Sequence, residues 1–244
     1  MTSHYSLAIC HLYPREMAIN GDRGNLLALT QRLRWRGIEP LVYEFHPGMT
    51  FPLKVDIILG GGGYGAAQYL VSADLLRINE ALHESIEVGT PALVVNGMYQ
   101  LFGSYLVTAE GEDLKGIGVF DMHTIGGKER LVGNVVVEHD GLGTILGYEN
   151  HSGRTMLGSD AAPLGRVVSG SGNNGSDKTE GACYKHAIGT YLHGPVLPLN
   201  PQLCDHLIRS ALEHKYQEPV ALTCLEEIDL LTNRARDQIL LRPR

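Results

Sequence analysis

The stretch PALVVNGMYQLFG, residues Pro91–Gly103, decides the fold of this chain. Its apolar run Ala92–Val95 stops at Asn96 and Gly97, after which the residues suit the start of a helix. A strand that turns sharply into a helix is a backbone device that raises one side chain, usually a nucleophile, above the edge of a sheet. Asn96 stands at the tip of this predicted turn, although a tight turn containing glycine also serves as plain punctuation between two elements.

Strand and helix patterns alternate through the first half of the chain. Leu26, Leu29 and Leu33 recur at three and four residues and predict an amphipathic helix. The run 55–59 is apolar throughout, as expected of a strand covered on both faces. This order predicts an α/β fold with a mostly parallel central sheet flanked by helices. The further strands expected are 5–12, 40–45 and 92–95, and the further helices are 75–87 and one that begins at 98–102.

The second half of the chain has a different pattern, with short β-type stretches separated by glycines from Leu114 onward. The stretches GIGVFDM, RLVGNVVVEHD, GTILGYENHSGRT and PLGRVVSGSGNN predict an antiparallel β extension of the same domain. A last buried strand is expected at Ile188–Leu192, and the tail from Leu225 to Leu241 has a helical pattern. We therefore expect one domain over residues 1–216 and a C-terminal helical tail over 217–244.

Composition and charge argue against several classes of protein. The formal net charge of −7, with no basic run, argues against nucleic-acid binding. No apolar run approaches the ~20 residues that span a bilayer, and no signal peptide is recognisable, so we expect a cytoplasmic protein without a transmembrane segment. The cysteines and histidines lack metal-ligand spacing, so we expect free thiols, no metal and no cofactor. The cysteines are Cys10, Cys183, Cys204 and Cys224.

Two further features lie at predicted strand ends, where ligands of parallel sheets bind. Gly60–Gly63 follow a strand without the motif of a nucleotide site, and they either present backbone N–H groups to an oxyanion or form a tight turn. His193 ends the last strand and is a candidate general base, with a structural role as the alternative. Since the ends of parallel strands meet at one edge, we expect these groups to lie near Asn96, as in an acyl-transfer site.

Several longer stretches, taken together, are similar to a known family. They resemble GatD, the glutamine amidotransferase subunits of lipid II isoglutaminyl synthases, in the CobB/CobQ-like branch of the class I (triad) glutamine amidotransferases. The resemblance runs from about Tyr5 to about Tyr216 and implies a single class I glutamine amidotransferase-like domain. It also implies that glutamine is the substrate, and that the ammonia serves a MurT-like Mur ligase partner that amidates the D-glutamate of the peptidoglycan stem peptide. The stretches are INGDRGNLLALTQRLRWRGI, PALVVNGMYQLFG, LKGIGVFDMHT, RLVGNVVVE, GYENHSGRT, LGRVVSGSGNN and GTYLHGPVLPLNP.

The resemblance implies roles for particular residues. The family's nucleophile, a cysteine, falls on Asn96, and its catalytic histidine falls on His193 within YLHGP. Its substrate-gating arginine falls on Arg130. Related triad enzymes carry an acid two residues after the histidine, where this chain has Pro195. That difference matches a branch in which the partner subunit is expected to supply the carboxylate.

The remaining implied roles concern substrate binding. The family's oxyanion loop falls on Gly61, Gly62 and Gly63, and the N–H of Gly97 is the second expected donor. The glutamine of the elbow motif falls on Gln100, which we count with these glycines as substrate-binding.

Two departures from the family's pattern bear on activity. Glutamine hydrolysis needs a thiolate that attacks the side-chain amide, whereas Asn96 offers only an amide with a delocalised nitrogen lone pair. The glycine loop continues as GYGAAQ over residues 63–68, where the family usually carries acidic residues. None of the four cysteines follows an elbow-type turn that could replace the nucleophile. We therefore expect glutamine hydrolysis to be lost or strongly impaired.

Other interpretations of the same residues stay open. The chain is alternatively a non-catalytic regulatory or scaffold subunit that binds glutamine or a cell-wall precursor in the retained pocket. Side-chain amidation of the cobyric-acid type is less expected, because that family's ATP-binding domain has no counterpart in this sequence. A single sequence is also compatible with an engineered replacement at Asn96.

Overall fold

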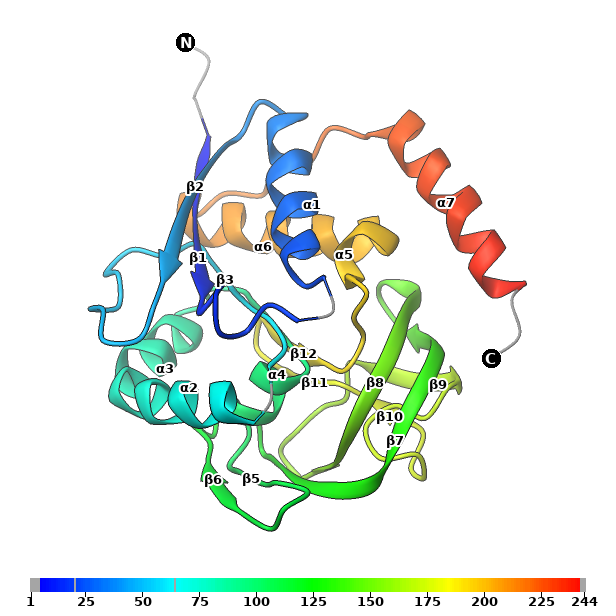
Figure 1. The fold of residues 1–244 in the computed structure, drawn as a ribbon. Helices are drawn as coiled ribbons and strands as arrows, with labels where there is room; N and C mark the ends of the chain where they lie inside the picture. Colours follow the sequence, from blue (N-terminus) through cyan, green and yellow to red (C-terminus); the bar gives the residue numbers. More distant parts are fainter. Residues whose placement is uncertain (1–4, 20, 64, 242–244) are drawn as a thin grey trace.

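We describe the fold from a computed structural model, in which residues 5–19, 21–63 and 65–241 are described. A six-stranded sheet in the order β11-β12-β4-β3-β1-β2 forms its centre (Figure 1). All neighbours in this sheet pair in parallel except β11 with β12, which confirms the predicted mostly parallel arrangement. Its strands are β1 (Ser6–Leu12), β2 (Glu39–Phe45), β3 (Ile57–Gly60), β4 (Ala92–Val95), β11 (Ala182–Tyr184) and β12 (Ala187–Thr190).

The central strands are buried on both faces, which explains their continuous apolar runs. In β4, Leu93 and Val95 belong to one hydrophobic cluster, with α1 (Arg23–Arg34) and α6 (Pro201–Tyr216). Ala92 and Val94 belong to a second cluster, with α2 (Ala66–Arg77), α3 (Asn79–Glu87) and α4 (Gly97–Leu101). Because successive side chains of a strand point to opposite faces, one short apolar run supplies both clusters. The two helix groups lie on opposite sides of the sheet in Figure 1.

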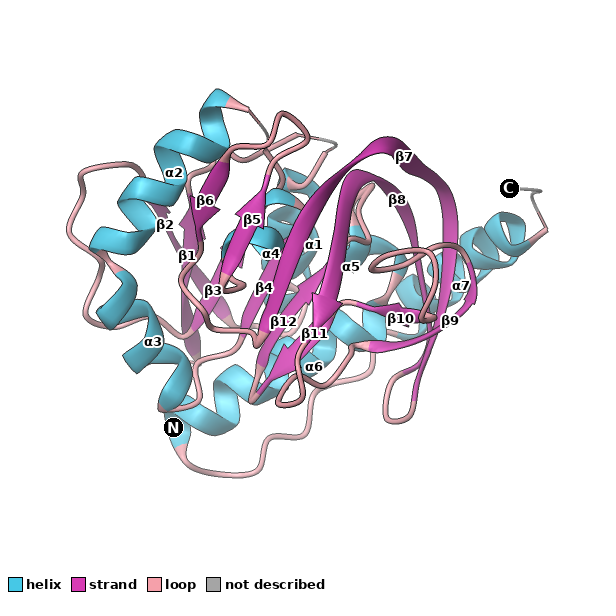
Figure 2. Ribbon diagram, turned by 90° about the horizontal axis from the view of Figure 1, so that it is seen from below, coloured by secondary structure: helices cyan, strands magenta, loops and turns pink. Residues whose placement is uncertain are grey.

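The predicted antiparallel extension forms a second six-stranded sheet beside the first (Figure 2). Its main feature is a long hairpin of β7 (Met122–His139) and β8 (Gly143–Leu157), which pair antiparallel. The strand β5 (Tyr105–Val107) pairs with β7 in parallel, so the sheet is mostly but not wholly antiparallel. The remaining strands are β6 (Asp113–Lys115), β9 (Gly165–Ser169) and β10 (Thr179–Glu180).

Two local predictions were wrong. The helix expected over 75–87 is the end of α2 followed by α3, because the chain turns at Ile78, which is 5% exposed and packs into the core. The stretch GIGVFDM, 116–122, forms a strand only at its last residue. Its backbone instead bonds the residues around the end of α4, as when Ile117 N–H donates to Leu101 O at 2.9 Å.

Residues beyond α6 carry one more helix, α7 (Glu226–Leu240), and none of its residues is buried. Two arginines join it to the body: Arg32 on α1 binds Asp229 at 2.7 Å, and Arg236 donates to Leu199 O at 2.6 Å, at the end of the short helix α5 (Val196–Leu199). The division into a domain over 1–216 and a tail over 217–244 stays a prediction. Among the described helices, none is long and apolar enough to cross a membrane.

Candidate active site

The turn after β4 has the geometry of a strand-to-helix elbow. Asn96 lies between β4 and α4 with φ 52° and ψ −113°, a conformation that a residue with a side chain rarely adopts. Such a residue costs about 1–3 kcal/mol of strain and persists only where the surroundings hold it. The Asn96 N–H donates to Thr190 O of β12 at 2.9 Å, which ties the elbow to the next strand. The predicted elbow is therefore present, and the strain marks it as more than punctuation.

The glycine loop after β3 lies directly against this elbow, as the strand order predicted. A Cβ atom added to Gly97 would stand 2.1 Å from Gly63 O, so no other residue fits here without a backbone shift. The N–H of Met98 donates to Gly61 O at 3.3 Å. The N–H of Gly62 is engaged elsewhere, since it donates to Asp22 Oδ2 at 2.5 Å. Gly62 therefore contributes no free donor to the expected oxyanion loop.

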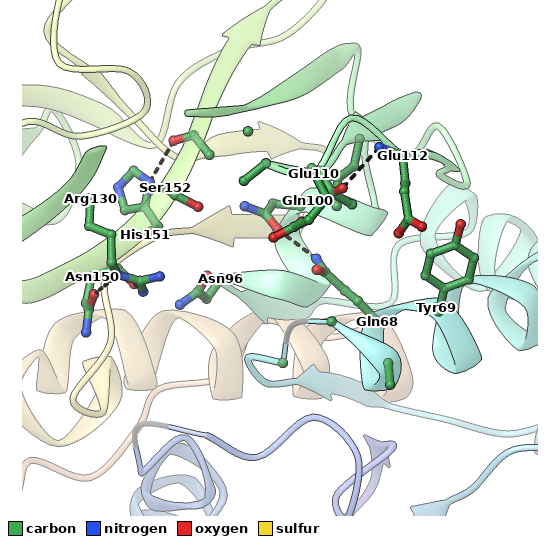
Figure 3. Close-up of a pocket in the computed structure, with 18 residues that line it drawn as sticks. Gln68, Tyr69, Asn96, Gln100, Glu110, Glu112, Arg130, Asn150, His151 and Ser152 are labelled. Carbon is green, nitrogen blue, oxygen red and sulfur yellow. Dashed lines mark hydrogen bonds between the residues drawn. The ribbon is translucent and has the colours of Figure 1, made fainter. Parts of the chain in front are cut away.

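A cavity of about 690 Å³ opens beside the elbow. Figure 3 shows Asn96 near its centre, with Arg130 on one side and Glu110 and Glu112 on the other. Gln100 and Gly63 also line it. The tertiary structure thus gathers these four predicted site residues around one cavity, whereas Gly61, Gly62, Gly97 and His193 are not among the described residues that line it.

Arg130 is exposed on β7 and is held by its neighbour strand β8. Its Nε donates to Asn150 Oδ1 at 2.8 Å, and a terminal nitrogen donates to Asn150 O at 2.9 Å. This two-point contact fixes the plane of the guanidinium group, as Figure 3 shows. Arg130 is therefore a preorganised cation at the rim of the cavity, able to bind a carboxylate.

Gln100 has both ends of its amide occupied by the protein. Its Oε1 accepts from Gln68 Nε2 at 2.7 Å, and its Nε2 donates to Tyr191 Oη at 3.0 Å. Gln68 and Gln100 are 4% and 7% exposed, so these bonds satisfy groups that would be costly to bury alone. Gln100 braces the helix that follows the elbow, and its predicted contact with substrate stays untested.

His193 is buried under the hairpin and does not lie on the cavity wall. Its backbone N–H and C=O both pair with Tyr148 of β8, at 2.9 and 3.1 Å. Burial lowers the pKa of His193 to about 4, and the charges of His151 and Arg130 act in the same direction. Its Nε2 is buried with no hydrogen-bond partner among the described residues. The imidazole is therefore neutral near pH 7, and its predicted role as a general base stays a prediction.

His151, which lines the cavity, and Glu149, which lies beside it, were missed from the sequence. His151 lines the cavity and is 2% exposed, and its Nε2 lies 3.9 Å from Glu149 Oε2. Burial alone would raise the pKa of Glu149. The pKa is nevertheless lowered overall, because Glu149 interacts with His151 and accepts hydrogen bonds from the N–H groups of Ser171 and Gly172. The signal for this pair was present in the sequence, because Glu149 and His151 stand two apart in a strand and so share one face.

The cysteines offer no replacement nucleophile. Burial raises the pKa of Cys10, Cys183 and Cys204 to about 12, which leaves each as an inert thiol at neutral pH. Cys224 is exposed, and none of the four is among the described residues that line the cavity. The described residues also contain no group of His, Cys, Asp and Glu side chains that could hold a metal ion.

The sequence of this chain is similar to those of known proteins. Residues 8–201 match the family described as CobB/CobQ-like glutamine amidotransferase domain. The lipid II isoglutaminyl synthase (glutamine-hydrolyzing) subunit GatD of Staphylococcus aureus (strain N315) is 42% identical over 213 residues, 86% of each chain. The subunit of the same name from Streptococcus pneumoniae (strain ATCC BAA-255 / R6) is 35% identical, over 92% of this chain and 87% of that chain.

The fold agrees as well. A crystal structure of a glutamine amidotransferase superposes with a TM-score of 0.57 at 16% identity, over 83% of this chain and 98% of that chain. The two chains thus share their overall fold. The chain belongs to the CobB/CobQ-like glutamine amidotransferase family.

Proposed function

We propose that this chain is a GatD-like amidotransferase subunit that pairs with a MurT-like Mur ligase, and that its own glutamine hydrolysis is lost or strongly impaired. The pairing would serve amidation of the D-glutamate of lipid II. The observation that carries the loss is the residue at the tip of the elbow: Asn96 follows β4 in a strained backbone conformation and lines the cavity. The identity and overlap with two GatD subunits support the family role.

The chemical argument concerns one covalent bond. In a working glutaminase, a thiolate attacks the side-chain carbonyl carbon of glutamine, and the amide nitrogen leaves as ammonia after taking a proton from the histidine. Water then hydrolyses the thioester and releases glutamate. The carboxamide of Asn96 has no nucleophilic lone pair and cannot be deprotonated near neutral pH. Loss of a nucleophile typically costs on the order of a millionfold in kcat, so His193 alone cannot sustain the reaction.

The test uses the purified chain with and without a MurT-like partner. We expect no release of glutamate from glutamine above background, and turnover by the unaltered chain would contradict the proposal. Asn96→Cys should create measurable glutaminase activity, whereas Asn96→Ala should stay at background. Mass spectrometry after exposure to a glutamine-mimicking electrophile should find an adduct on residue 96 in the Cys variant alone.

A second candidate function is non-catalytic binding of glutamine or a cell-wall precursor. The retained cavity favours it, since Arg130 is held in place by Asn150 and the cavity wall also carries His151. Calorimetry with millimolar glutamine distinguishes the two roles. Heat of binding without turnover supports a regulatory subunit, and no heat would leave scaffolding of the ligase as the better account.

A further inference from the structure

A buried carboxylate stands directly behind the glycine loop. Asp22 precedes α1 and is 3% exposed, and its Oδ2 accepts the N–H of Gly62 at 2.5 Å. Gly62 in turn separates Asp22 from the elbow, because a Cβ at Gly62 would stand 3.0 Å from Asp22 Oδ2 and 3.3 Å from Asn96 Cβ. One carboxylate oxygen therefore holds the peptide that packs against the tip of the elbow.

The second oxygen of Asp22 faces a different environment. Asp22 Oδ1 is buried and has no hydrogen-bond partner among the described residues, and the same is true of His11 Nδ1 on β1. Both residues line a small cavity of about 10 Å³, whose wall includes Gly60, Gly61 and Asn25. His11 is 4% exposed, so each of the two orphan atoms belongs to a side chain more than nine-tenths buried.

The size and lining of this cavity fit one water molecule. A cavity needs roughly 10–15 Å³ for a single water, together with two or more polar partners. An ionised carboxylate oxygen accepts a hydrogen bond from water, and the same water can form a second hydrogen bond with an imidazole nitrogen. A buried carboxylate without such compensation is strongly disfavoured, and burial indeed raises the pKa of Asp22 to about 6.

We propose that Asp22 is the positioning residue of the glycine loop, and that one water molecule bridging Asp22 Oδ1 and His11 Nδ1 completes this anchor. With both oxygens bonded, the carboxylate is fixed and holds Gly62 against the elbow. The orientation of the neighbouring Gly63 peptide, which lines the larger cavity, then depends on Asp22. The structural half of this inference stands alone, and its effect on ligand binding rests on the proposed glutamine pocket.

The test compares Asp22→Ala and Asp22→Asn with the control variant Asp74→Ala. Asp74 Oδ1 accepts the N–H of Gly48 at 2.9 Å, a similar bond outside the cavity lining. Amide hydrogen exchange by NMR reports on Gly62 directly. We expect Gly62 to exchange on the order of tenfold to a hundredfold faster in Asp22→Ala, and to stay protected in Asp22→Asn, whose side-chain oxygen still accepts. Asp74→Ala should leave Gly62 unchanged.

Three results would overturn parts of the proposal. Equal exchange of Gly62 in the unaltered chain and in Asp22→Ala would exclude the anchor. If Asp22→Ala does not fold, the Asp22→Asn variant decides. Rapid exchange of Gly62 in folded Asp22→Asn would show that a side-chain oxygen at position 22 is not enough to hold the Gly62 N–H. A crystal structure with ordered internal waters but none between Asp22 and His11 would exclude the bridge.

Ligand binding is a separate readout. Calorimetry should give about tenfold weaker glutamine binding for Asp22→Ala and an unchanged affinity for Asp74→Ala. Unchanged affinity with increased Gly62 exchange would refute the effect on the pocket. Failure of the unaltered chain to bind glutamine would refute the binding function, while the Gly62 exchange and the crystal structure would still decide the anchor.

Discussion

The ring of His151 lies flat on the ring of Tyr191, with centroids 3.6 Å apart and planes inclined by 3°. His151 Nδ1 lies 2.9 Å from Gly153 O, and since a carbonyl only accepts, this nitrogen carries the proton. The hydroxyl of Tyr191 accepts from Gln100, on the helix that follows the elbow. The hairpin is therefore joined to the elbow through a stacked pair whose imidazole also faces the cavity.

His151→Phe separates the packing role of this ring from its polar role. Phenylalanine preserves the stacking on Tyr191 but removes both ring nitrogens. We expect the melting temperature to change by only a few degrees, while calorimetry shows glutamine binding about tenfold weaker. Unchanged affinity in this variant would mean that His151 makes no polar contact with the ligand.

Arg130→Ala should weaken glutamine binding by about tenfold or more, because it removes the cation at the cavity rim. Arg130→Lys should recover only part of the affinity, since lysine cannot reproduce the two-point contact with Asn150. Arg166, an exposed arginine on β9 outside the cavity lining, gives the control variant Arg166→Ala. Equal affinities for the two alanine variants would remove Arg130 from the binding site.

His193 of the unaltered chain should titrate far below an ordinary histidine. Burial lowers the pKa of His193 to about 4, so its neutral form is present throughout the range above about pH 5. We therefore expect the ring resonances of His193 to stay unchanged between pH 7 and pH 5.5 in an NMR titration. A titration midpoint near pH 6.5 would show that His193 titrates as an ordinary exposed histidine.

Gly97→Ala should destabilise the fold, because the added Cβ would meet Gly63 O at 2.1 Å. Overpacking of this kind costs about 1–3 kcal/mol, measured as a lower free energy of unfolding in denaturant. Gly141→Ala is the matched control, since a Cβ there meets its nearest neighbour at an ordinary 3.6 Å. Similar stabilities for the two variants would show that the glycine loop does not press on the elbow.

Glu180 should make stability depend on pH. Burial raises the pKa of Glu180 from 4.5 to about 7. Hydrogen bonds from Tyr191 N–H at 2.7 Å and Thr190 Oγ1 at 2.9 Å act in the opposite direction but are outweighed. Between these pKa values the folded state binds more protons than the unfolded state. The contribution of Glu180 to stability therefore falls as pH rises from about 4.5 to 7. The shift corresponds to a loss on the order of 3 kcal/mol.

Denaturant unfolding at pH 5 and pH 8 measures this effect. Glu180→Gln should remove it, and Glu138→Gln, at an exposed position, should not. The raised pKa of Asp22 also lowers the free energy of unfolding as pH rises. The lowered pKa of His193 has the opposite effect and raises the free energy of unfolding between pH 4 and 6.5. An identical pH dependence for Glu180→Gln and the unaltered chain would contradict the prediction.

Local sequence determined the elements that carry the elbow. The run Ala92–Val95 is apolar throughout because both faces of β4 are covered, and Asn96 and Gly97 mark the turn that follows it. These are properties of a few consecutive residues, so periodicity and turn chemistry were enough to predict them. The order of strands and helices then implied that the glycine loop and the elbow share one edge of the sheet.

Only the tertiary structure decided which side chains complete the site. Asp22 meets Gly62 across 40 residues of sequence, and the pairing of β8 with β7 carries Glu149, Asn150 and His151 over the elbow. The break at Ile78 likewise follows from packing into the core, where no glycine or proline marks it. Contacts between distant segments depend on strand register and on how layers pack, and local preferences do not encode either, because the free energy that selects them comes from burial in the assembled fold.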